Sequence, residues 1–390
     1  MLAAVLAAGA RADVLHVPAE FPTVQEAVDA AQPGDQIVLA AGSYHDPVEV
    51  QDAQDVTIRG QGQVILAGGS VAEAGLQLLN CTDVSVEHLR VEDALGTGIF
   101  VGQSTGVALR HVTCRAAVGE AVQVELADGM LLDHVLVEGP GSGGILLSEC
   151  SDSVVSHCKV KGVDFEGIGL SDTIHCVVDH CRVTGANPGI ALGLTGSSVG
   201  CQARKCVVLD APEMGIRAVG EDCLLLDNRV QHAVDQGLVV DFPSVGGLVQ
   251  GNKAIACGRG IEINGTGLLL RDNRIVSPEQ DGLVCGNGVN EVADTRVLHA
   301  GHDAFVIGAV SGGSLTGCKA SKATGQGFEV AGTHLVFTGN TSTGAGEFGF
   351  HVTGTDNLFV GNKATGSGAV GLDDEVGGNS YLENEFGVLN

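Results

Sequence analysis

Large aromatic side chains and basic side chains are scarce in this sequence. Its 390 residues include no tryptophan, and Tyr44 and Tyr381 are the only tyrosines. Because sugar rings usually stack on aromatic side chains, this scarcity argues against a long polysaccharide groove lined by aromatic platforms. Lys and Arg number 20 against 47 Asp and Glu, which gives a formal net charge of −27. Such a chain repels nucleic acid, anionic lipid and uronate polymers, so no nucleic-acid partner is expected.

Two further patterns are missing. No apolar run reaches the length of about 20 residues that a transmembrane helix needs, so no membrane insertion is expected. The twelve cysteines include no Cys-x-x-Cys pair and no zinc-finger spacing. We therefore expect mostly reduced, buried thiols that behave as small apolar side chains. One or two disulfides stay open as an alternative if the protein is exported.

The dominant feature that is present is a repeat of 22 or 23 residues, which runs from about Leu76 to the C-terminal end. Each unit begins with a small residue followed by alternating apolar residues, as in Gly144-Ile145-Leu146-Leu147. Twelve of the thirteen spacings are 22 or 23, and the exception is 26, between Gly189 and Gly215. The fourteen predicted starts are Gly75, Gly98, Ala121, Gly144, Gly167, Gly189, Gly215, Gly237, Gly260, Gly282, Ala304, Gly327, Gly349 and Gly371.

Alternating apolar residues indicate strands with one buried face, and a unit of this length has room for three short strands but not for a helix between them. The chain must therefore coil, with each strand pairing in parallel with its equivalent one unit later. This arrangement is a parallel β-helix. Because no linker or charge block interrupts the period, we expect one solenoid over residues 13–390, with regular coils over residues 71–390.

The N-terminal residues differ from the repeat. Residues 1–12 are apolar and end in Ala-Arg-Ala, which is similar to a signal-peptidase site, so we interpret them as the remnant of a secretion signal; a disordered start is the alternative. Thr23 and Glu26 form a capping box, and an amphipathic helical face follows. We expect residues 13–70 to form the first coils and an N-terminal capping helix that covers the open end of the apolar core.

The same N-terminal stretch carries a family resemblance. Its motifs are Val17-Pro18, Phe21-Pro22-Thr23-Val24-Gln25-Glu26-Ala27-Val28, Pro33-Gly34-Asp35, Gly42-Ser43-Tyr44 and Val56-Thr57-Ile58-Arg59-Gly60. They resemble the opening of secreted right-handed β-helix proteins of the pectin-lyase-like superfamily. The groups most similar are the NosD proteins, accessory to nitrous-oxide reductase, and the carbohydrate-binding and sugar-hydrolase repeat domains. The resemblance implies an all-β fold, a single-stranded right-handed parallel β-helix of about 14–16 three-strand coils.

Polar residues recur thirteen positions after the starts. The column reads His88, His111, His134, His157 and His180, and later Asn228, Asn252 (two residues out of register), Asn273, Asn340, Asn362 and Asn384. We interpret it as one corner ladder, because a polar side chain in every coil can hydrogen-bond to the coils above and below. Five imidazoles in register also permit a metal site. The Asn continuation favours the structural ladder, and no metal ligand is predicted.

The candidate site follows from the resemblance, since the related enzymes bind substrate on the outer face of the first strand and its flanking turns. Asp281 and Asp303 lie in neighbouring units there, with His302 beside Asp303 and Glu262 one unit earlier. Two carboxylates about 5 Å apart can serve as nucleophile and acid of a glycoside hydrolase. Chance proximity in an acidic chain is the alternative. The motifs of polygalacturonases, mannuronan epimerases, pectate lyases and pectin esterases are absent.

These observations favour a secreted or periplasmic scaffold that binds or supports without catalysis, with a polysaccharide or cell-surface glycan as ligand. A polysaccharide-active enzyme, a hydrolase before a lyase or epimerase, remains open, and so does a copper-enzyme accessory role by resemblance to NosD. No cofactor is expected, although calcium could bridge to an anionic substrate. The last coil, ending Glu385-Phe386-Gly387-Val388-Leu389-Asn390, has no obvious cap, so we expect a partner, a second copy or further residues beyond this sequence to cover it.

Overall fold

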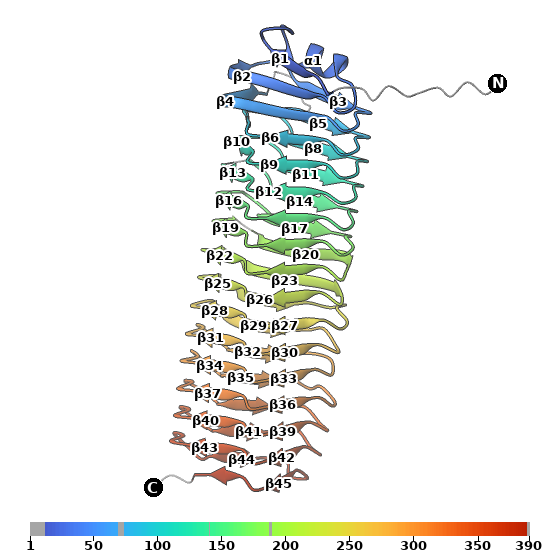
Figure 1. Ribbon diagram of the computed structural model, residues 1–390. Helices are drawn as coiled ribbons and strands as arrows, with labels where there is room; N and C mark the ends of the chain where they lie inside the picture. The colour runs from blue at the N-terminus through green and yellow to red at the C-terminus, as the bar shows by residue number, and fades with distance from the viewer. Residues whose placement is uncertain (1–11, 69–73, 140, 187–188, 388–390) are drawn as a thin grey trace, which may run out of the picture. The chain divides into compact units, whose positions relative to one another are not determined.

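The computed structural model describes residues 12–68, 74–139, 141–186 and 189–387. The predicted secretion signal therefore lies outside the described residues, apart from Ala12. The chain divides into two compact units, residues 1–159 (unit 1) and 160–390 (unit 2). In both units the described residues form short parallel strands that follow one another in sequence order (Figure 1).

Unit 1 begins with the predicted capping helix. The Thr23 side chain accepts a hydrogen bond from the Glu26 N–H, and Val24 and Ala27 are the buried residues of the helix that follows. This helix contacts the first strands of the unit (Figure 1), so the prediction of a capped N-terminal helix is confirmed. The elements here are β1 (Val14–Val17), α1 (Val24–Ala30), β2 (Gln36–Tyr44) and β4 (Thr57–Ala67).

The remaining strands of unit 1 occupy three positions in each coil. The first strands are β3 (Val48–Gln51), β5 (Leu76–Leu79), β8 (Ile99–Gly102), β11 (Val122–Glu125) and β14 (Ile145–Ser148). The second strands are β6 (Ser85–Glu87), β9 (Ala108–Arg110), β12 (Leu131–Asp133) and β15 (Val154–Ser156). The third strands are β7 (Arg90–Glu92), β10 (Thr113–Arg115), β13 (Leu136–Glu138) and β16 (Lys159–Lys161), the last of which contains the division between the units.

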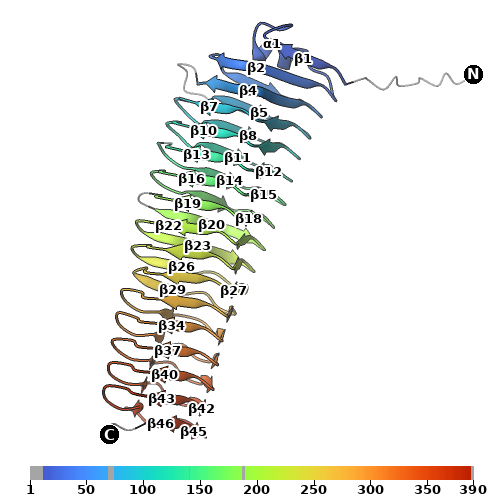
Figure 2. The ribbon, with the colours of Figure 1, turned by 60° about the vertical axis from the view of Figure 1, so that its left-hand side comes forward.

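Unit 2 repeats the same pattern, and its third strands follow one another along one side in Figure 2. The first strands are β17 (Ile168–Ser171), β20 (Ile190–Val199), β23 (Met214–Glu221), β26 (Gln236–Val240), β29 (Arg259–Ile263), β32 (Leu283–Cys285), β35 (Phe305–Ile307), β38 (Phe328–Val330), β41 (Phe350–Val352) and β44 (Leu372–Asp374). The second strands are β18 (Val177–Asp179), β21 (Gln202–Arg204), β24 (Leu224–Leu226), β27 (Leu248–Gln250), β30 (Leu269–Arg271), β33 (Glu291–Ala293), β36 (Ser314–Thr316), β39 (Val336–Thr338), β42 (Leu358–Val360) and β45 (Ser380–Leu382). The third strands are β19 (Arg182–Thr184), β22 (Val207–Leu209), β25 (Arg229–Gln231), β28 (Lys253–Ile255), β31 (Arg274–Val276), β34 (Arg296–Leu298), β37 (Lys319–Ser321), β40 (Thr341–Thr343), β43 (Lys363–Thr365) and β46 (Glu385–Phe386).

Within each unit, each strand pairs in parallel with its equivalent in the next coil, and the predicted apolar columns form the core. In unit 2, Leu283, Phe305, Phe328 and Phe350 hold one position in four successive first strands, and all four are 0% exposed. The three phenylalanine rings stack with centroids 4.7 and 4.6 Å apart. The fifteen first strands of the described residues agree with the predicted number of coils.

One predicted coil start is wrong. Ile168 pairs with Leu192, and Leu192 pairs with Ile216, so the coil after Gly167 begins at Ala191 and not at Gly189. Both Gly189-Ile190 and Ala191-Leu192 follow the small-then-large pattern, and only the backbone pairing separates them. The irregular spacing of 26 is replaced by two coils of 24 residues each.

The single polar ladder is also wrong, because the His and Asn residues occupy two adjacent columns. His88, His111, His134, His157 and His180 all have left-handed backbone, with φ between 52° and 55°. The residue after each of them points inward. Asn228 belongs to this inward column and is 1% exposed, while the left-handed residue before it is Asp227. The position thirteen residues after the coil start falls in the left-handed column in some coils and in the inward column in others. The reason is that the first turn varies in length between coils.

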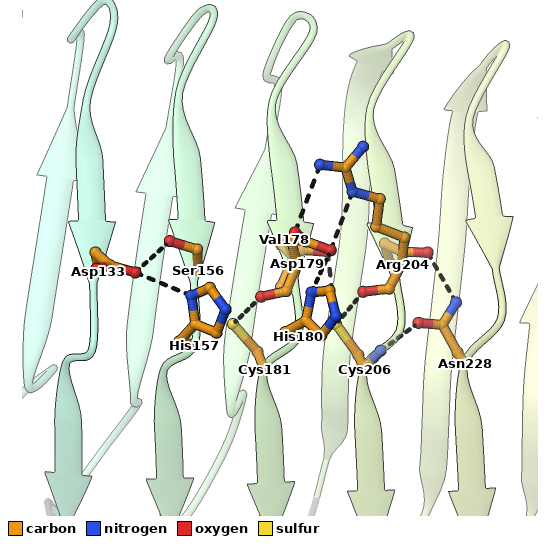
Figure 3. A network of polar contacts seen from close by, with 11 residues as sticks. Asp133, Ser156, His157, Val178, Asp179, His180, Cys181, Arg204, Cys206 and Asn228 are labelled. Atoms are coloured by element: carbon orange, nitrogen blue, oxygen red, sulfur yellow. Dashed lines mark hydrogen bonds and ion pairs between the residues drawn. The ribbon is translucent and has the colours of Figure 1, made fainter.

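The exposed His column is held by ring stacking and by carboxylates. In unit 1 the rings of His88, His111, His134 and His157 follow one another with centroids 4.8 to 4.9 Å apart; the first and last pairs are stacked, and the His111–His134 pair is tilted by 33°. Asp133 accepts from His157 and from Ser156, and in unit 2 Asp179 bonds to His180 and Arg204 (Figure 3). These ring and carboxylate contacts link one coil to the next, which favours a structural role for the column.

The buried Asn column makes a different set of bonds. The Asn340 Nδ2 donates to the Leu315 carbonyl at 2.9 Å, and its Oδ1 accepts from the Cys318 N–H at 2.9 Å. Asn362 repeats this pattern toward Phe337 and Asn340. Each amide therefore satisfies backbone groups at a buried corner, which would otherwise lose hydrogen bonds. The prediction of an Asn ladder is confirmed for this column alone.

All twelve cysteines are buried and lie outside disulfides, in agreement with the prediction of mostly reduced, buried thiols. In unit 2, Cys206 lies in the same inward column as Asn228, and the Asn228 Oδ1 accepts its N–H (Figure 3). Burial raises the pKa of the Cys114 and Cys285 thiols to about 12. These groups are uncharged at neutral pH and act as small apolar side chains in the core.

Candidate functional site

The predicted site residues lie on or beside the first strands of unit 2. Side chains between two buried residues of these strands point outward, as in Glu262, the fourth residue of β29, and His351, the second residue of β41. Asp281 precedes β32 by two residues, and Asp303 precedes β35 by two residues. Asp281 and Asp303 therefore lie just before the start of two neighbouring first strands, at one edge of the outer face.

Three of the four predicted residues come together. The His302 Nδ1 lies 2.8 Å from the Asp281 Oδ1 and 3.1 Å from the Asp303 Oδ2. The Asp303 N–H also donates to the Asp281 Oδ1 at 3.2 Å, and the other oxygen of Asp303 accepts from the Gln326 N–H at 2.6 Å. The Asp303 side chain is 6% exposed, whereas the His302 side chain is 68% exposed. The cluster therefore presents an imidazole to solvent and keeps one carboxylate underneath it.

The two carboxylates of this cluster stabilise the protonated form of the His302 imidazole. The hydrogen bond to Asp281 raises the pKa of His302, and the nearby Asp303 charge adds to this effect. Burial raises the pKa of Asp303, although the Gln326 N–H and His302 act in the opposite direction. Both oxygens of Asp303 have partners, so this carboxylate positions His302 and is poorly placed to attack a substrate.

The fourth predicted residue, Glu262, does not join the cluster. It pairs in register with Val284, which lies in the middle of the next first strand, whereas Asp281 lies before that strand. Its carboxylate accepts from Arg259 at 3.0 Å, Gln236 at 3.1 Å and Asn264 at 3.1 Å. Burial favours the neutral acid, but the bonds from Asn264, Gln236 and Arg259 outweigh it and lower the pKa of Glu262.

A second imidazole cluster was not predicted. The His351 Nδ1 lies 2.5 Å from the Glu329 Oε2, and its Nε2 lies 3.1 Å from Glu375 and 3.8 Å from Asp373. The imidazole is 15% exposed and stacks on Phe348. Burial lowers its basicity, but the bonds to Glu375 and Glu329 outweigh this effect and raise the pKa of His351. The sequence signal for this cluster was that Glu329, His351 and Asp373 hold the same outward position in three successive first strands.

A third group of charged residues was also missed. The Glu166 Oε1 occupies the space above Gly193, where an added Cβ would lie 2.0 Å from that oxygen. Arg217 pairs in register with Gly193 and donates from Nη2 to the Asp241 Oδ2 at 2.9 Å. Burial raises the pKa of Glu166 to about 7, while the Arg217 charge lowers it in part. With the predicted coil start at Gly189, Gly193 was not assigned to the outward column. The sequence pattern therefore did not place Gly193 beside Arg217.

Three groups of side chains could offer ligands to a cation, with ligand atoms within 4.8 Å of one another. They are Asp133, His134 and His157 in unit 1, and in unit 2 Asp281, His302 and Asp303, and His351, Asp373 and Glu375. Each group mixes imidazole with carboxylate, which suits transition metals better than calcium, since calcium prefers oxygen ligands throughout.

A match to a family model decides the family. Residues 74–232 and 222–386 match the model described as a right handed beta helix region. The chain belongs to the right-handed β-helix family. The predicted handedness and the fold-level resemblance to pectin-lyase-like proteins are confirmed for this β-helix. A comparison with curated proteins found no match. The specific relation to NosD proteins stays a prediction.

Solved structures similar to this β-helix include a variant of the catalytic domain of GH87 alpha-1,3-glucanase in complex with tetrasaccharides. It has a TM-score of 0.55 and 11% identity, covering 95% of this chain and 69% of that chain. The Siphovirus 9NA tailspike receptor binding domain has a TM-score of 0.50 and 12% identity, covering 94% of this chain and 77% of that chain. At these identities the likeness shows the fold alone. Among the described residues, no helix has the length and apolar character that crossing a membrane requires.

Proposed function

We propose that this β-helix is a secreted or periplasmic scaffold that binds a carbohydrate on the outer face of the first strands of unit 2. The observation that carries the proposal is the exposed His302 imidazole, which two carboxylates hold in place. Two structurally similar proteins support it: one is a glucanase domain in complex with tetrasaccharides, and the other is a receptor binding domain.

The physical reason is preorganisation. Sugar hydroxyl groups donate and accept hydrogen bonds, and bonds that involve a charged partner are stronger than neutral ones. Since Asp281 and Asp303 fix the His302 ring before a ligand arrives, less side-chain entropy is lost on binding. The net charge of −27 disfavours acidic polysaccharides, so the proposed ligand is a neutral glycan.

The test is a titration of oligosaccharides by calorimetry. The panel contains maltotetraose, cellotetraose, laminaritetraose and nigerose as neutral probes, and oligogalacturonate as the acidic probe. We expect a neutral probe to bind and His302→Ala to weaken it about tenfold, the value of one hydrogen bond to a charged group. His299→Asn is the matched control, because the left-handed backbone at His299, φ 55°, accepts Asn.

No neutral probe binding at millimolar concentration would contradict the proposal. So would equal binding by the wild type and His302→Ala. The titration is repeated with EDTA and with calcium, because the proposal includes no resident metal. Binding that is lost in EDTA and restored by calcium would assign a bridging calcium ion instead.

A second candidate function is glycoside hydrolysis at the same cluster. Its specific support is the raised pKa of Asp303, since a carboxyl group that keeps its proton can act as the general acid beside a second carboxyl group, here Asp281. Release of reducing ends from a neutral probe, abolished by Asp281→Asn and by Asp303→Asn, would support hydrolysis. Binding without product release would support the scaffold.

A further inference from the structure

Two buried polar atoms of opposite character lie on the outer face of unit 2 without partners. The Glu166 Oε1 and the Arg217 Nε are both shielded from solvent, and neither has a hydrogen-bond partner among the described residues. The other end of the Arg217 guanidinium is held by Asp241. Leaving a buried charged group unsatisfied is costly, so this pair requires an explanation.

The local backbone creates the space for the pair. Gly193 lies between Gly169 and Arg217 in the outward column of three successive first strands. With two glycines in succession the column has no side chains to fill it, and the Glu166 carboxyl group extends over Gly193. The carboxyl group therefore occupies the place of a missing outward side chain, close enough to Arg217 for the guanidinium charge to act on it.

We propose that Glu166 and Arg217 form a receptor for a hydroxyl group of a neutral glycan. A hydroxyl group can donate its proton to the Glu166 Oε1 and accept the Arg217 Nε–H with its oxygen, which satisfies both atoms at once. An anionic group would meet the carboxylates of Glu166 and Asp241, and a cationic group would meet Arg217. The inference rests on the proposed glycan binding and names a second contact site for it.

Exposed aromatic rings flank the receptor in the sequence. Phe165, directly before Glu166, is 61% exposed, and Phe242, directly after Asp241, is 75% exposed. The other nine phenylalanines of the described residues are buried or half-buried. A sugar presents an apolar ring face beside its hydroxyl groups, so a neighbouring aromatic ring and a hydroxyl receptor complement the same ligand class.

The experiment removes the receptor without removing a charge. Gly193→Ala places a Cβ 2.0 Å from the Glu166 Oε1 and must displace the carboxyl group, while Glu166 and Arg217 both remain. Gly42→Ala is the matched control, because nothing lies within 4 Å of the added Cβ there. Affinity for the neutral probe that binds best to the wild type is measured by calorimetry, with Glu166→Ala and Arg217→Met as further variants.

We expect Gly193→Ala, Glu166→Ala and Arg217→Met each to weaken binding about tenfold or more, and Gly42→Ala to leave it unchanged. Circular dichroism and the melting temperature confirm that each variant is folded. If His302→Ala weakens binding and these three variants do not, this inference is wrong while the proposed function stands. If no neutral probe binds the wild type, the proposed function fails and this inference with it.

Discussion

Most histidines of this protein lie at corners where the backbone is left-handed. Nine of its thirteen histidines have positive φ, including all five of the His column. Asn, Asp and His tolerate this backbone better than most side chains, and Asp227, Asp272 and Asp294 hold the same corner in later coils. A histidine repeat in a β-helix is therefore explained first by backbone conformation. The histidines of the two candidate clusters, His302 and His351, lie outside these left-handed positions.

The first prediction at the residue scale concerns Glu166 and pH. Its pKa is about 7 in the native state against 4.5 for the free side chain, so the native state binds this proton more tightly. Stability from this group is therefore present at low pH and is lost as pH rises from about 4.5 to about 7. Glu166→Gln should raise the free energy of unfolding at pH 8 by up to about 3 kcal/mol.

Urea unfolding of both proteins at pH 4 and pH 8 measures this difference. At pH 4 the Glu166 carboxyl group is mostly protonated in both the native and the unfolded state. The free energy of unfolding of Glu166→Gln should therefore exceed that of the wild type by little at this pH. A gain of the same size at both pH values would mean that Glu166 does not titrate as its burial requires.

At the element scale, identical side chains stack in successive first and second strands. Phe305, Phe328 and Phe350 form one stack, and Phe337 and Phe359 form a second, with ring centroids 4.7 Å apart. Parallel in-register pairing imposes this repetition, because each side chain lies directly above its equivalent. The elements therefore stabilise one another through column contacts between coils.

Phe328 is the sharpest test of this stack, since it has a ring on both sides and is 0% exposed. We expect Phe328→Ala to lower the free energy of unfolding by about 3–5 kcal/mol, because the cavity cannot close between two fixed coils. Phe242→Ala is the control, because that side chain is 75% exposed. Urea unfolding checks both variants, and equal small losses would disprove the stacking argument.

The whole molecule carries a strongly one-sided charge. With 47 acidic and 20 basic residues, its side chains repel one another more in the folded state than in the expanded chain. Arg115–Glu138 and Lys363–Glu385 link neighbouring coils, but such surface pairs contribute little. Repulsion among the remaining carboxylates is the larger effect of charge on stability.

This balance predicts the effect of salt. Added sodium chloride between about 10 and 200 mM shortens the screening length and should raise the melting temperature. Differential scanning calorimetry at pH 7 measures the change, with sucrose at equal osmolarity as the uncharged control. A melting temperature that falls with salt would show that the ion pairs outweigh the repulsion.

The sequence alone determined the coil, the strand count and the capped helix. A repeat near 22 residues leaves only one way to pair three short strands, and Thr23 with Glu26 specifies a helix start. It also brought Asp281 and Asp303 together, because both lie two residues before equivalent strands. Only the tertiary structure separated the His and Asn columns, moved the coil start to Ala191 and placed the Glu166 carboxyl group over Gly193. These depend on backbone register and on turns of varying length, which a pattern of residue types does not specify.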